Sequence, residues 1–457
     1  MSQVRLDPWF LGTDPVALLV STFGTMSLKL TGPHSSAASR TAVAFLCVAG
    51  ARVVCASTFV ISPDGSDTGT GSVASPLASI NAASRRARVG DTIYLRGGTY
   101  AWAQQQSIDV KPDGVNWVTF SSYPGETAVI DGANMPPDRD MVHVGDSVKV
   151  QYLSFTRGQK SNLSLWNAHR IRVKYCRFSQ AVGPGILIGS NTVNGAGDVQ
   201  IIGCKVFDCV QGNKGGKASH WPPALQLYQA TNVLVSGCLV NRNFGEGIGY
   251  CRTTSSEIRG NTVYDNFSVN IYLDNVWDTK VVDNFIYTTQ DPTYFRKGRA
   301  ASGISCAAEK IANPIGLARC TIANNIVTNC FTGFWYSDFG RGGGLKGFKL
   351  VNNTFYRSTG PLLWIDSDTG HSSNVVENNI FEQRGTAPIV RGSTRGFRLG
   401  KNCWVGGDPL LFSQATDVAT PPTFQNVRQL SRDGFRLTPQ SKLAAKKIGY
   451  GGASALP

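Results

Sequence analysis

The sequence is poor in charged residues and contains no long hydrophobic run. Charged residues make up 16% of the 457 positions and hydrophobic residues 42%. So little charge beside so much apolar material excludes a disordered chain and a coiled coil. No apolar run approaches the roughly 18 residues that a transmembrane helix requires. No pair of Cys residues or Cys/His cluster has the spacing of a zinc site.

Basic residues outnumber acidic ones by 44 to 30, which gives a formal net charge of +14. An excess of this size favours a polyanionic partner. Nucleic acid, an anionic lipid surface and an acidic polysaccharide all qualify. The alternative is a uniformly basic surface that serves only solubility.

The N-terminus has the pattern of an export signal. Lys29 and Arg40 precede the apolar stretch 41–51, and small residues follow up to Ala56. This order predicts a secretory signal cleaved after Ala56, and a secreted, periplasmic or cell-surface protein. Export argues against nucleic acid as the partner. An N-terminal arm without this role is the alternative. Nine Cys follow residue 56, so disulfides are open to the chain, but an odd number leaves at least one thiol free.

A repeat of about 23 residues runs through the middle of the chain. Short apolar strands of period two are each followed by Asn or Cys, at positions Cys176, Cys204, Cys238, Asn261, Asn284, Asn325, Asn353, Asn379 and Asn402. A second short strand follows in most repeats, as in 247–251 and 270–274. Such repeats predict an all-β fold, a right-handed parallel β-helix of about ten rungs stacked about 4.8 Å apart.

The aligned Asn column has two physical explanations. Asn tolerates the left-handed conformation at a bend, and stacked Asn side chains can pass hydrogen bonds from rung to rung. Cys176, Cys204 and Cys238 share this column. We therefore expect them to be small buried thiols without a catalytic role.

Motifs near both ends resemble a known family. Residues 59–67, 89–95 and 97–100 resemble the N-terminal part of pectin-lyase-like β-helix proteins, and residues 408–411 and 434–441 resemble their C-terminal part. The resemblance covers about residues 58–450. It implies a short capping helix within 77–88, and relatives among secreted polysaccharide lyases and glycoside hydrolases. The expected organisation is an N-terminal extension (1–56), a cap with the first rungs (57–145), the ladder-bearing β-helix (146–405) and a C-terminal cap with a tail (406–457).

Aromatic side chains are expected on the outer face of the second strand. Period two directs Ile186, Ile248 and their counterparts inward and the alternate residues outward. The outward set includes four aromatic residues that suit stacking against sugar rings, which are Tyr228, Tyr272, Trp335 and Trp364. A loop folded over them is the alternative.

Carboxylates gather at the far end of the same strand. Asp274 and Glu309 are expected about 8 Å apart, and Glu309 and Asp338 about 6 Å apart. Such separations suit an acid and a base for glycosidic cleavage, or a calcium site made by these three residues. The cofactor expectation is therefore either none or calcium. Ordinary surface acids are the alternative.

Two long loops bring basic residues to this face. They contribute a wall suited to substrate carboxylates, made of Lys214, Lys217, His220, Arg296, Lys297 and Arg299. His220 is a candidate proton acceptor, and Arg252 is placed beside Asp274 to hold a uronate. Glu246 is a further candidate. Its register puts it roughly 16 Å from Asp274, so we expect it to join His220 instead.

Three functions remain open from the sequence. The first is a lyase that cleaves an acidic polysaccharide by β-elimination, and the second is a glycoside hydrolase with an Asp/Glu pair. The third is a non-catalytic protein for glycan binding or polysaccharide assembly. The fold cannot choose among them, because function depends on the site.

Overall fold

The computed structural model describes residues 56–309, 316–339, 343–366 and 369–451. The expected export segment lies outside these residues except for Ala56, so export and the cleavage position stay predictions. No helix in the described ranges is both long enough and apolar enough to cross a membrane.

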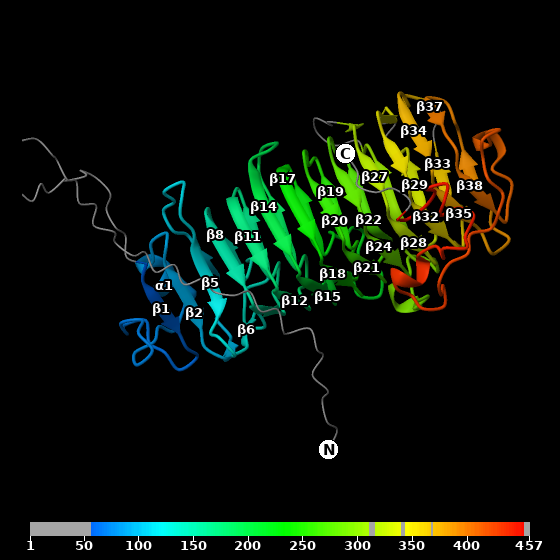
Figure 1. Cartoon of the computed structure of the whole chain (residues 1–457). Helices are drawn as coiled ribbons and strands as arrows, with labels where there is room; N and C mark the ends of the chain where they lie inside the picture. Colours follow the sequence, from blue (N-terminus) through cyan, green and yellow to red (C-terminus); the bar gives the residue numbers. More distant parts are fainter. Residues whose placement is uncertain (1–55, 310–315, 340–342, 367–368, 452–457) are drawn as a thin grey trace, which may run out of the picture. The chain divides into compact units, whose positions relative to one another are not determined.

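Three long parallel sheets wind through the chain in turn, so that each full rung adds one strand to each sheet (Figure 1). Sheet 1 consists of β1 (Thr58–Ile61), β2 (Thr92–Leu95), β5 (Val118–Ser122), β8 (Val148–Gln151), β11 (His169–Lys174), β14 (Ala196–Ile202), β17 (Ala230–Ser236), β20 (Glu257–Arg259), β23 (Lys280–Val282), β27 (Thr321–Ala323), β31 (Lys349–Val351), β34 (Asn374–Glu377) and β37 (Phe397–Leu399). Sheet 2 consists of β3 (Gly98–Tyr100), β6 (Ala128–Asp131), β9 (Ser154–Thr156), β12 (Arg177–Ser179), β15 (Lys205–Phe207), β18 (Leu239–Asn241), β21 (Thr262–Tyr264), β24 (Phe285–Tyr287), β28 (Ile326–Thr328), β32 (Thr354–Tyr356), β35 (Ile380–Glu382) and β38 (Cys403–Val405). Sheet 3 consists of β4 (Gln106–Ile108), β7 (Val142–Val144), β10 (Leu163–Trp166), β13 (Ile186–Gly189), β16 (Leu225–Tyr228), β19 (Ile248–Cys251), β22 (Val269–Asp274), β25 (Ser302–Ala307), β29 (Phe334–Ser337), β33 (Leu363–Ile365) and β36 (Val390–Gly392). A short pair, β26 (Leu317–Ala318) and β30 (Leu345–Lys346), lies beside the later rungs.

The predicted parallel β-helix is confirmed, but the coil is longer than about ten rungs. The three sheets contain 13, 12 and 11 strands. The sequence estimate was short because the rungs before residue 150 carry no Asn or Cys in the aligned column. A strand that is not followed by the aligned Asn or Cys could not be recognised from the sequence as part of a rung.

The interior follows the expected alternation. In sheet 3, Ile248 pairs with Ile271, and Ile271 with Ile304, and all three are fully buried. Each rung covers the apolar side chains of the next, so the core is one continuous column rather than a central cluster. The predicted inward positions of this strand are therefore confirmed.

A short helix, α1 (Ile80–Arg86), closes the N-terminal end. Its N-cap is Ser79, whose hydroxyl accepts a hydrogen bond from the Ala82 N–H, and its buried face includes Ile80 and Ala83. The helix packs against β1 and β4. This confirms the expected cap and places it within the predicted range 77–88. The described residues also form four single-turn 3-10 helices, at Gln211–Asn213, Pro292–Tyr294, Leu410–Phe412 and Asp433–Phe435.

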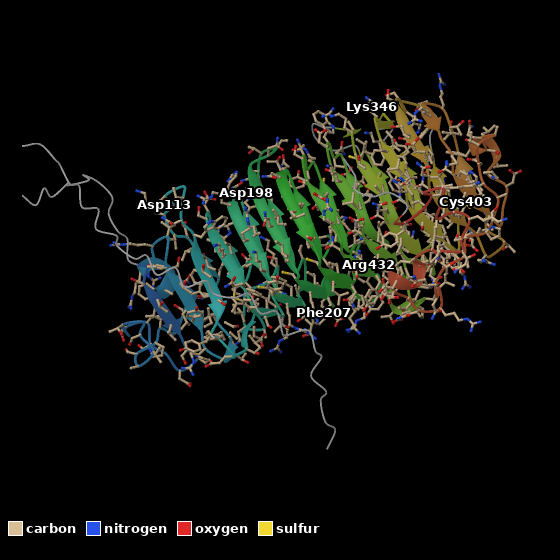
Figure 2. The ribbon with its side chains drawn as sticks, in the orientation of Figure 1. Asp113, Asp198, Phe207, Lys346, Cys403 and Arg432 are labelled. Carbon is tan, nitrogen blue, oxygen red and sulfur yellow. The ribbon has the colours of Figure 1, made fainter. Side chains whose placement is uncertain are left out.

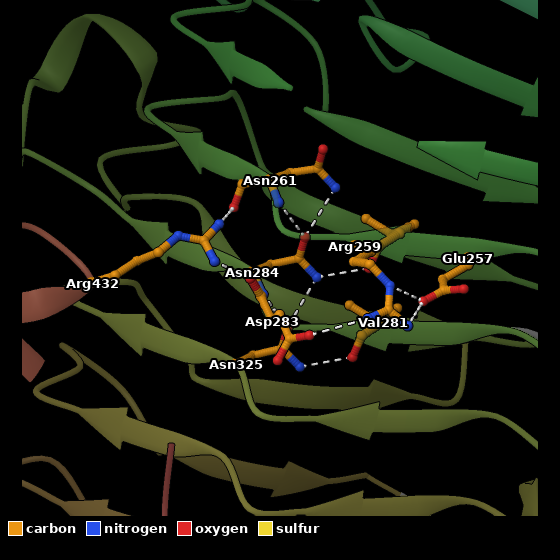
Figure 3. Close-up of polar contacts among 9 residues, drawn as sticks. Glu257, Arg259, Asn261, Val281, Asp283, Asn284, Asn325 and Arg432 are labelled. Carbon is orange, nitrogen blue, oxygen red and sulfur yellow. Dashed lines mark hydrogen bonds and ion pairs between the residues drawn. The ribbon is translucent and has the colours of Figure 1, made fainter. Parts of the chain in front are cut away.

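The Asn column forms the predicted ladder at the turn between sheets 1 and 2 (Figure 3). Asn284 Nδ2 and the Asn284 backbone N–H both donate to Asn325 Oδ1 at 3.0 Å. Asn325 repeats the pattern toward Asn353, at 2.9 and 3.0 Å. Each Asn also donates to a main-chain carbonyl of the preceding rung, as Asn325 does to Val281 at 2.8 Å. The ladder therefore satisfies backbone groups that the turn leaves buried.

The expectation that these Asn residues adopt the left-handed conformation is wrong. The residue before most of them does so instead, as Asp283, Asn324 and Asn352 show with φ of 57°, 54° and 57°. The bend is made one residue earlier, which leaves the aligned side chain free to point inward. The expected buried thiols are confirmed, because Cys176, Cys204 and Cys238 are at most 2% exposed. All nine described Cys are free thiols.

The C-terminal segment after β38 returns along sheet 2 rather than ending at the last rung. Arg432 Nη2 donates to the Asn261 carbonyl at 2.8 Å (Figures 2 and 3). The Phe435 ring packs against Phe285 and Tyr356, with centroids 6.1 and 5.4 Å apart. This segment covers sheet 2 over the middle rungs, whereas the outer face of sheet 3 carries the candidate site.

Candidate active site on the outer face of sheet 3

Two outward rows run along sheet 3 in strict register. One row passes through His143, Ser164, Leu187, Gln226, Gly249, Tyr272, Ser305, Trp335, Trp364 and Arg391. The other passes through Trp166, Gly189, Tyr228, Cys251, Asp274, Ala307 and Ser337. The predicted pairing of these strands is confirmed, and it brings polar and aromatic side chains from many rungs to one face.

Four residues form an acid cluster near the middle of these rows, and we define it as Glu246, Tyr272, Asp274 and Glu309. The Tyr272 hydroxyl donates a short hydrogen bond to the Glu309 carboxylate. The Glu309 backbone N–H donates to Asp274 Oδ1 at 2.9 Å. The end of β22 is thereby tied to the residues after β25. The predicted proximity of Asp274 and Glu309 is confirmed, although the contact runs through the Glu309 main chain.

Asp274 is a supporting residue rather than an open carboxylate. Its Oδ1 also accepts from Asn275 Nδ2 at 2.8 Å, and its Oδ2 accepts from Cys251 Sγ at 3.2 Å. Only 5% of Asp274 is exposed, and burial raises the pKa of this carboxyl. The expectation of an outward, accessible Asp274 is wrong, because the strand end and the main chain at Glu309 enclose it.

Glu246 has a pKa that suits a general acid at neutral pH. Its side chain extends along the strand over Gly249, where a Cβ would lie 3.6 Å from Glu246 Oε2. Burial, then the negative charges of Glu309 and Asp274, raise the Glu246 pKa to about 8, against the opposing charge of Arg296. Some of its surface stays open to solvent. A carboxyl group with this pKa is protonated at neutral pH and can donate a proton.

The expectation that Glu246 stands apart from Asp274 is therefore wrong. The register estimate measured backbone positions only. The Glu246 side chain lies over Gly249, and its charge acts on Tyr272, whose pKa is raised by burial followed by the charges of Glu246 and Glu309.

One arginine from the long loops lies beside the acid cluster. The Arg296 guanidinium is 4.7 Å from the centre of the Trp221 ring, and its Nη1 donates to Ser268 Oγ at 3.1 Å. Trp221 in turn meets the edge of Phe267, with centroids 4.9 Å apart. These contacts fix the position of Arg296. Its positive charge acts on Glu246 and opposes the rise in the Glu246 pKa.

The other predicted basic residues lie further out. Lys217, His220 and Arg299 are exposed. His220 contacts its neighbour Ser219 at 3.4 Å, and Arg299 lies 4.7 Å over the Phe331 ring. The structure thus brings Arg296 to the acid cluster, whereas the contacts of His220 and Arg299 lie elsewhere. Roles for Lys217, His220 and Arg299 stay predictions.

Arg252 is 8% exposed, and its Nε has no hydrogen-bond partner among the described residues. Its positive charge acts on Cys251, the neighbour of Asp274 in the row. The predicted place beside Asp274 is confirmed. Holding a substrate carboxylate stays a prediction for this residue.

An aromatic platform lies on the C-terminal side of the acid cluster. The Trp335 and Trp364 rings stack with centroids 4.9 Å apart, and Trp335 Nε1 donates to Asp366 Oδ2 at 3.1 Å. The Arg391 guanidinium lies 4.5 Å from the Trp364 ring centre. Asp338 belongs to this region, since burial and then the charges of Asp338 and Asp366 raise the pKa of Tyr336 to about 12. Such a face suits a sugar ring that carries a negative charge.

The three carboxylates expected to bind calcium do not form a ligand set. Across the residues described, no group of three His, Cys, Asp or Glu side chains is placed to hold a metal ion. Both Asp274 oxygens already accept hydrogen bonds, and the charge of Asp338 acts on Tyr336. These residues therefore do not fit a calcium ion, and the chemistry below uses none.

Sequence reasoning missed two elements of this face. Trp166 stacks with Tyr228, with centroids 6.5 Å apart and planes within 8°. Extending the outward row by two rungs before Tyr228 would have found it. The role of Gly249 could not be found in this way, because it depends on the path of the Pro223 segment, which lies against it.

Replacing Gly249 by Ala is expected to lower activity by at least about tenfold while the fold is kept. The new Cβ would lie 2.1 Å from Pro223 Cγ, so the Pro223 segment, which lies over Gly249 as Glu246 does, must move. Gly385→Ala is the matched control, since a Cβ there meets nothing within 4 Å. Equal activity of Gly249→Ala and the control would contradict this role for Gly249.

Comparisons with known proteins agree with the fold. Residues 59–278 match the family described as "Pel9A-like, right handed beta helix region". A curated relative, the pectate lyase PEL9 of Emericella nidulans, is 35% identical over 106 residues, which are 21% of this chain and 26% of that protein. The chain thus matches about a quarter of that relative's length.

Solved structures show the same architecture at low sequence identity. Pectate lyase Pel9A has a TM-score of 0.51 at 15% identity, with 84% of this chain and 90% of that chain covered. XylC in complex with xylose has a TM-score of 0.57 at 11% identity, with 80% and 86% covered. At such identities the likeness is one of fold. The chain therefore has the right-handed parallel β-helix fold, and its residues 59–278 match the Pel9A-like β-helix region.

Proposed function

We propose that this protein is an enzyme that hydrolyses glycosidic bonds of an acidic polysaccharide, with Glu246 as the general acid and Glu309 as the base. The observation that carries the proposal is the pKa of Glu246, raised to about 8 by burial and by the charges of Glu309 and Asp274. A carboxyl group held protonated beside a second carboxyl group is the usual arrangement for such a reaction.

The reaction follows from these roles. Glu246 donates its proton to the oxygen of the glycosidic bond, and the bond between that oxygen and the anomeric carbon breaks. Glu309 accepts a proton from a water molecule, whose oxygen forms the new bond to the anomeric carbon. Exchange of one proton with solvent restores both carboxyl groups.

The remaining members of the cluster position Glu309. The Tyr272 hydroxyl donates to the Glu309 carboxylate and fixes its orientation. Asp274 fixes the Glu309 main chain from the other side. Glu309 is thus held by two residues of strand β22.

An acidic substrate is supported by charge. The chain has a net charge of +14, and Arg296, Arg299 and Arg391 each lie over an aromatic ring on this face. Pairs of this kind suit a uronic acid, since the ring can stack and the carboxylate can meet the guanidinium. The predicted export signal would place the enzyme where such polysaccharides occur.

A lyase is the second candidate. The curated relative over 106 residues is named a pectate lyase. β-Elimination needs a base at the carbon beside the carboxylate and a group that neutralises that carboxylate. Arg296 or Arg252 could serve as the neutralising group. Within the acid cluster the candidate for that base is Tyr272, and burial followed by the charges of Glu246 and Glu309 raises its pKa and keeps its proton in place, so we rank hydrolysis first.

The experiment that tests the proposal uses the chain from residue 57 on a panel of polygalacturonate, alginate and xylan, with and without a chelator. Reducing ends and the absorbance of unsaturated uronides are followed in parallel. Hydrolysis predicts new reducing ends without the absorbance, unchanged by the chelator. A rise of both signals would establish the lyase instead, and no signal on the whole panel would contradict both.

A further inference from the structure

A cleft on the N-terminal side of the acid cluster has no role in the reaction described above. It encloses about 590 Å³ and is lined by residues of β7, β10, β13 and β16, together with Asp140 and Lys160. Its last polar wall residue, Gln226, pairs in register with Gly249, over which Glu246 extends. The cleft therefore ends two rungs before Tyr272 of the acid cluster in the same row.

The cleft contains an aromatic platform built from two rungs. The Trp166 and Tyr228 rings are parallel within 8°, with centroids 6.5 Å apart. Gly189 lies between them in the row, and a Cβ there would come within 2.5 Å of the Trp166 ring. The absent side chain at Gly189 thus lets Trp166 lie flat on the sheet and makes one continuous surface with Tyr228. Half-exposed rings arranged in this way suit the apolar face of a sugar.

A second observation points to a ligand in the same cleft. Ser164 lines it and is fully buried, yet its hydroxyl has no hydrogen-bond partner among the residues described. A buried hydroxyl without a partner is costly unless something else supplies one. The charges at the rim largely cancel, since Lys160 Nζ lies 3.3 Å from Asp140 Oδ2. Recognition here therefore depends on ring stacking and hydroxyl contacts rather than on charge.

We propose that the Trp166–Tyr228 platform is a distal subsite that binds sugar units of the substrate chain away from the bond that is cleaved. This inference rests on the proposed function for the position of that bond. Tyr228 is two rungs from Asp274 and Trp166 is four, so the platform spans about 10 to 19 Å from the acid cluster. The Trp335–Trp364 platform lies on the other side of the acid cluster. With both platforms occupied, an internal stretch of the polysaccharide lies across the cluster and is cleaved there.

The test measures binding apart from cleavage. Glu246→Gln in the chain from residue 57 serves as the non-cleaving parent, and oligogalacturonides of two lengths, trimers and octamers, are titrated calorimetrically. Adding Trp166→Ala is expected to weaken octamer binding by about tenfold and to leave trimer binding unchanged. Trp117→Ala is the matched control, because Trp117 lies beside sheet 1 against Arg170 and Arg172 and should change neither.

The outcomes separate this inference from the proposed function. Octamer affinity unchanged by Trp166→Ala, or no octamer binding by the parent, would overturn the distal subsite. Trimer binding weakened equally would also overturn it, since the platform would then belong to the cleavage position. Octamer binding that depends on Trp166, in a protein that cleaves nothing on the panel, would support the subsite and contradict the hydrolase.

Discussion

Replacing Glu246 by Gln is expected to lower kcat by about 10²–10⁴-fold at neutral pH, the usual contribution of a general acid. Gln has the shape of the protonated carboxyl group but has no proton to give. Because Glu246 is already protonated below pH about 8, the substitution removes no charge in the neutral range. The melting temperature at pH 6 should therefore stay close to that of the wild type while activity is lost.

The pH dependence of wild-type activity is a second test of Glu246 as the general acid. Its activity is expected to fall as the pH rises through about 8, where Glu246 loses its proton. Glu257→Gln is the matched control, since Glu257 lies on sheet 1 and pairs with Arg259. Activity of Glu246→Gln within a few-fold of this control would contradict the assignment of the general acid.

Replacing Asn325 by Leu is expected to destabilise the β-helix by about 3 kcal/mol, although the two side chains are similar in volume. The change removes the acceptor of Asn284 N–H and Nδ2, and it removes the donors to Val281 O and Asn353 Oδ1. All of these groups are buried, so water cannot replace the lost partners. The midpoint of urea denaturation measures the effect.

Two further variants make the Asn325 result specific. Asn325→Cys is expected to cost less, because the same column holds Cys at 176, 204 and 238, where each Sγ donates to main-chain carbonyls. Asn191→Leu, in an exposed turn, should leave the midpoint unchanged. If Asn325→Leu were no less stable than Asn191→Leu, the ladder would contribute little to the stability of the coil.

The fold could be predicted because a solenoid repeats its local rules. One aligned column, Cys176 to Asn402, was enough to place the turn between sheets 1 and 2 and to set the register of sheet 3. The rungs before residue 150 were missed because their turns use other residues. The left-handed positions were displaced by one, since sequence alone does not show whether Asn324 or Asn325 makes the bend.

The site was harder to predict than the fold because it depends on side-chain paths. Register placed Asp274, Tyr272 and Trp335 correctly on one face. It could not show that Asp274 is enclosed by its hydrogen bonds, or that Glu246 reaches along the strand over Gly249. His220 was a candidate on residue type alone, and its exposed loop position gave no further support. Which of several nearby acids is protonated depends on burial and neighbouring charge, and neither follows from a sequence pattern.

The central claim is that Glu246 holds a proton at neutral pH in the folded protein. Difference infrared spectroscopy of the wild type against Glu246→Gln, recorded as a function of pH, tests it without a substrate. We predict a protonated carboxyl band that is present at pH 6 and disappears as the pH rises through about 8. Disappearance of the band near pH 4.3, the ordinary value for Glu, would contradict the account.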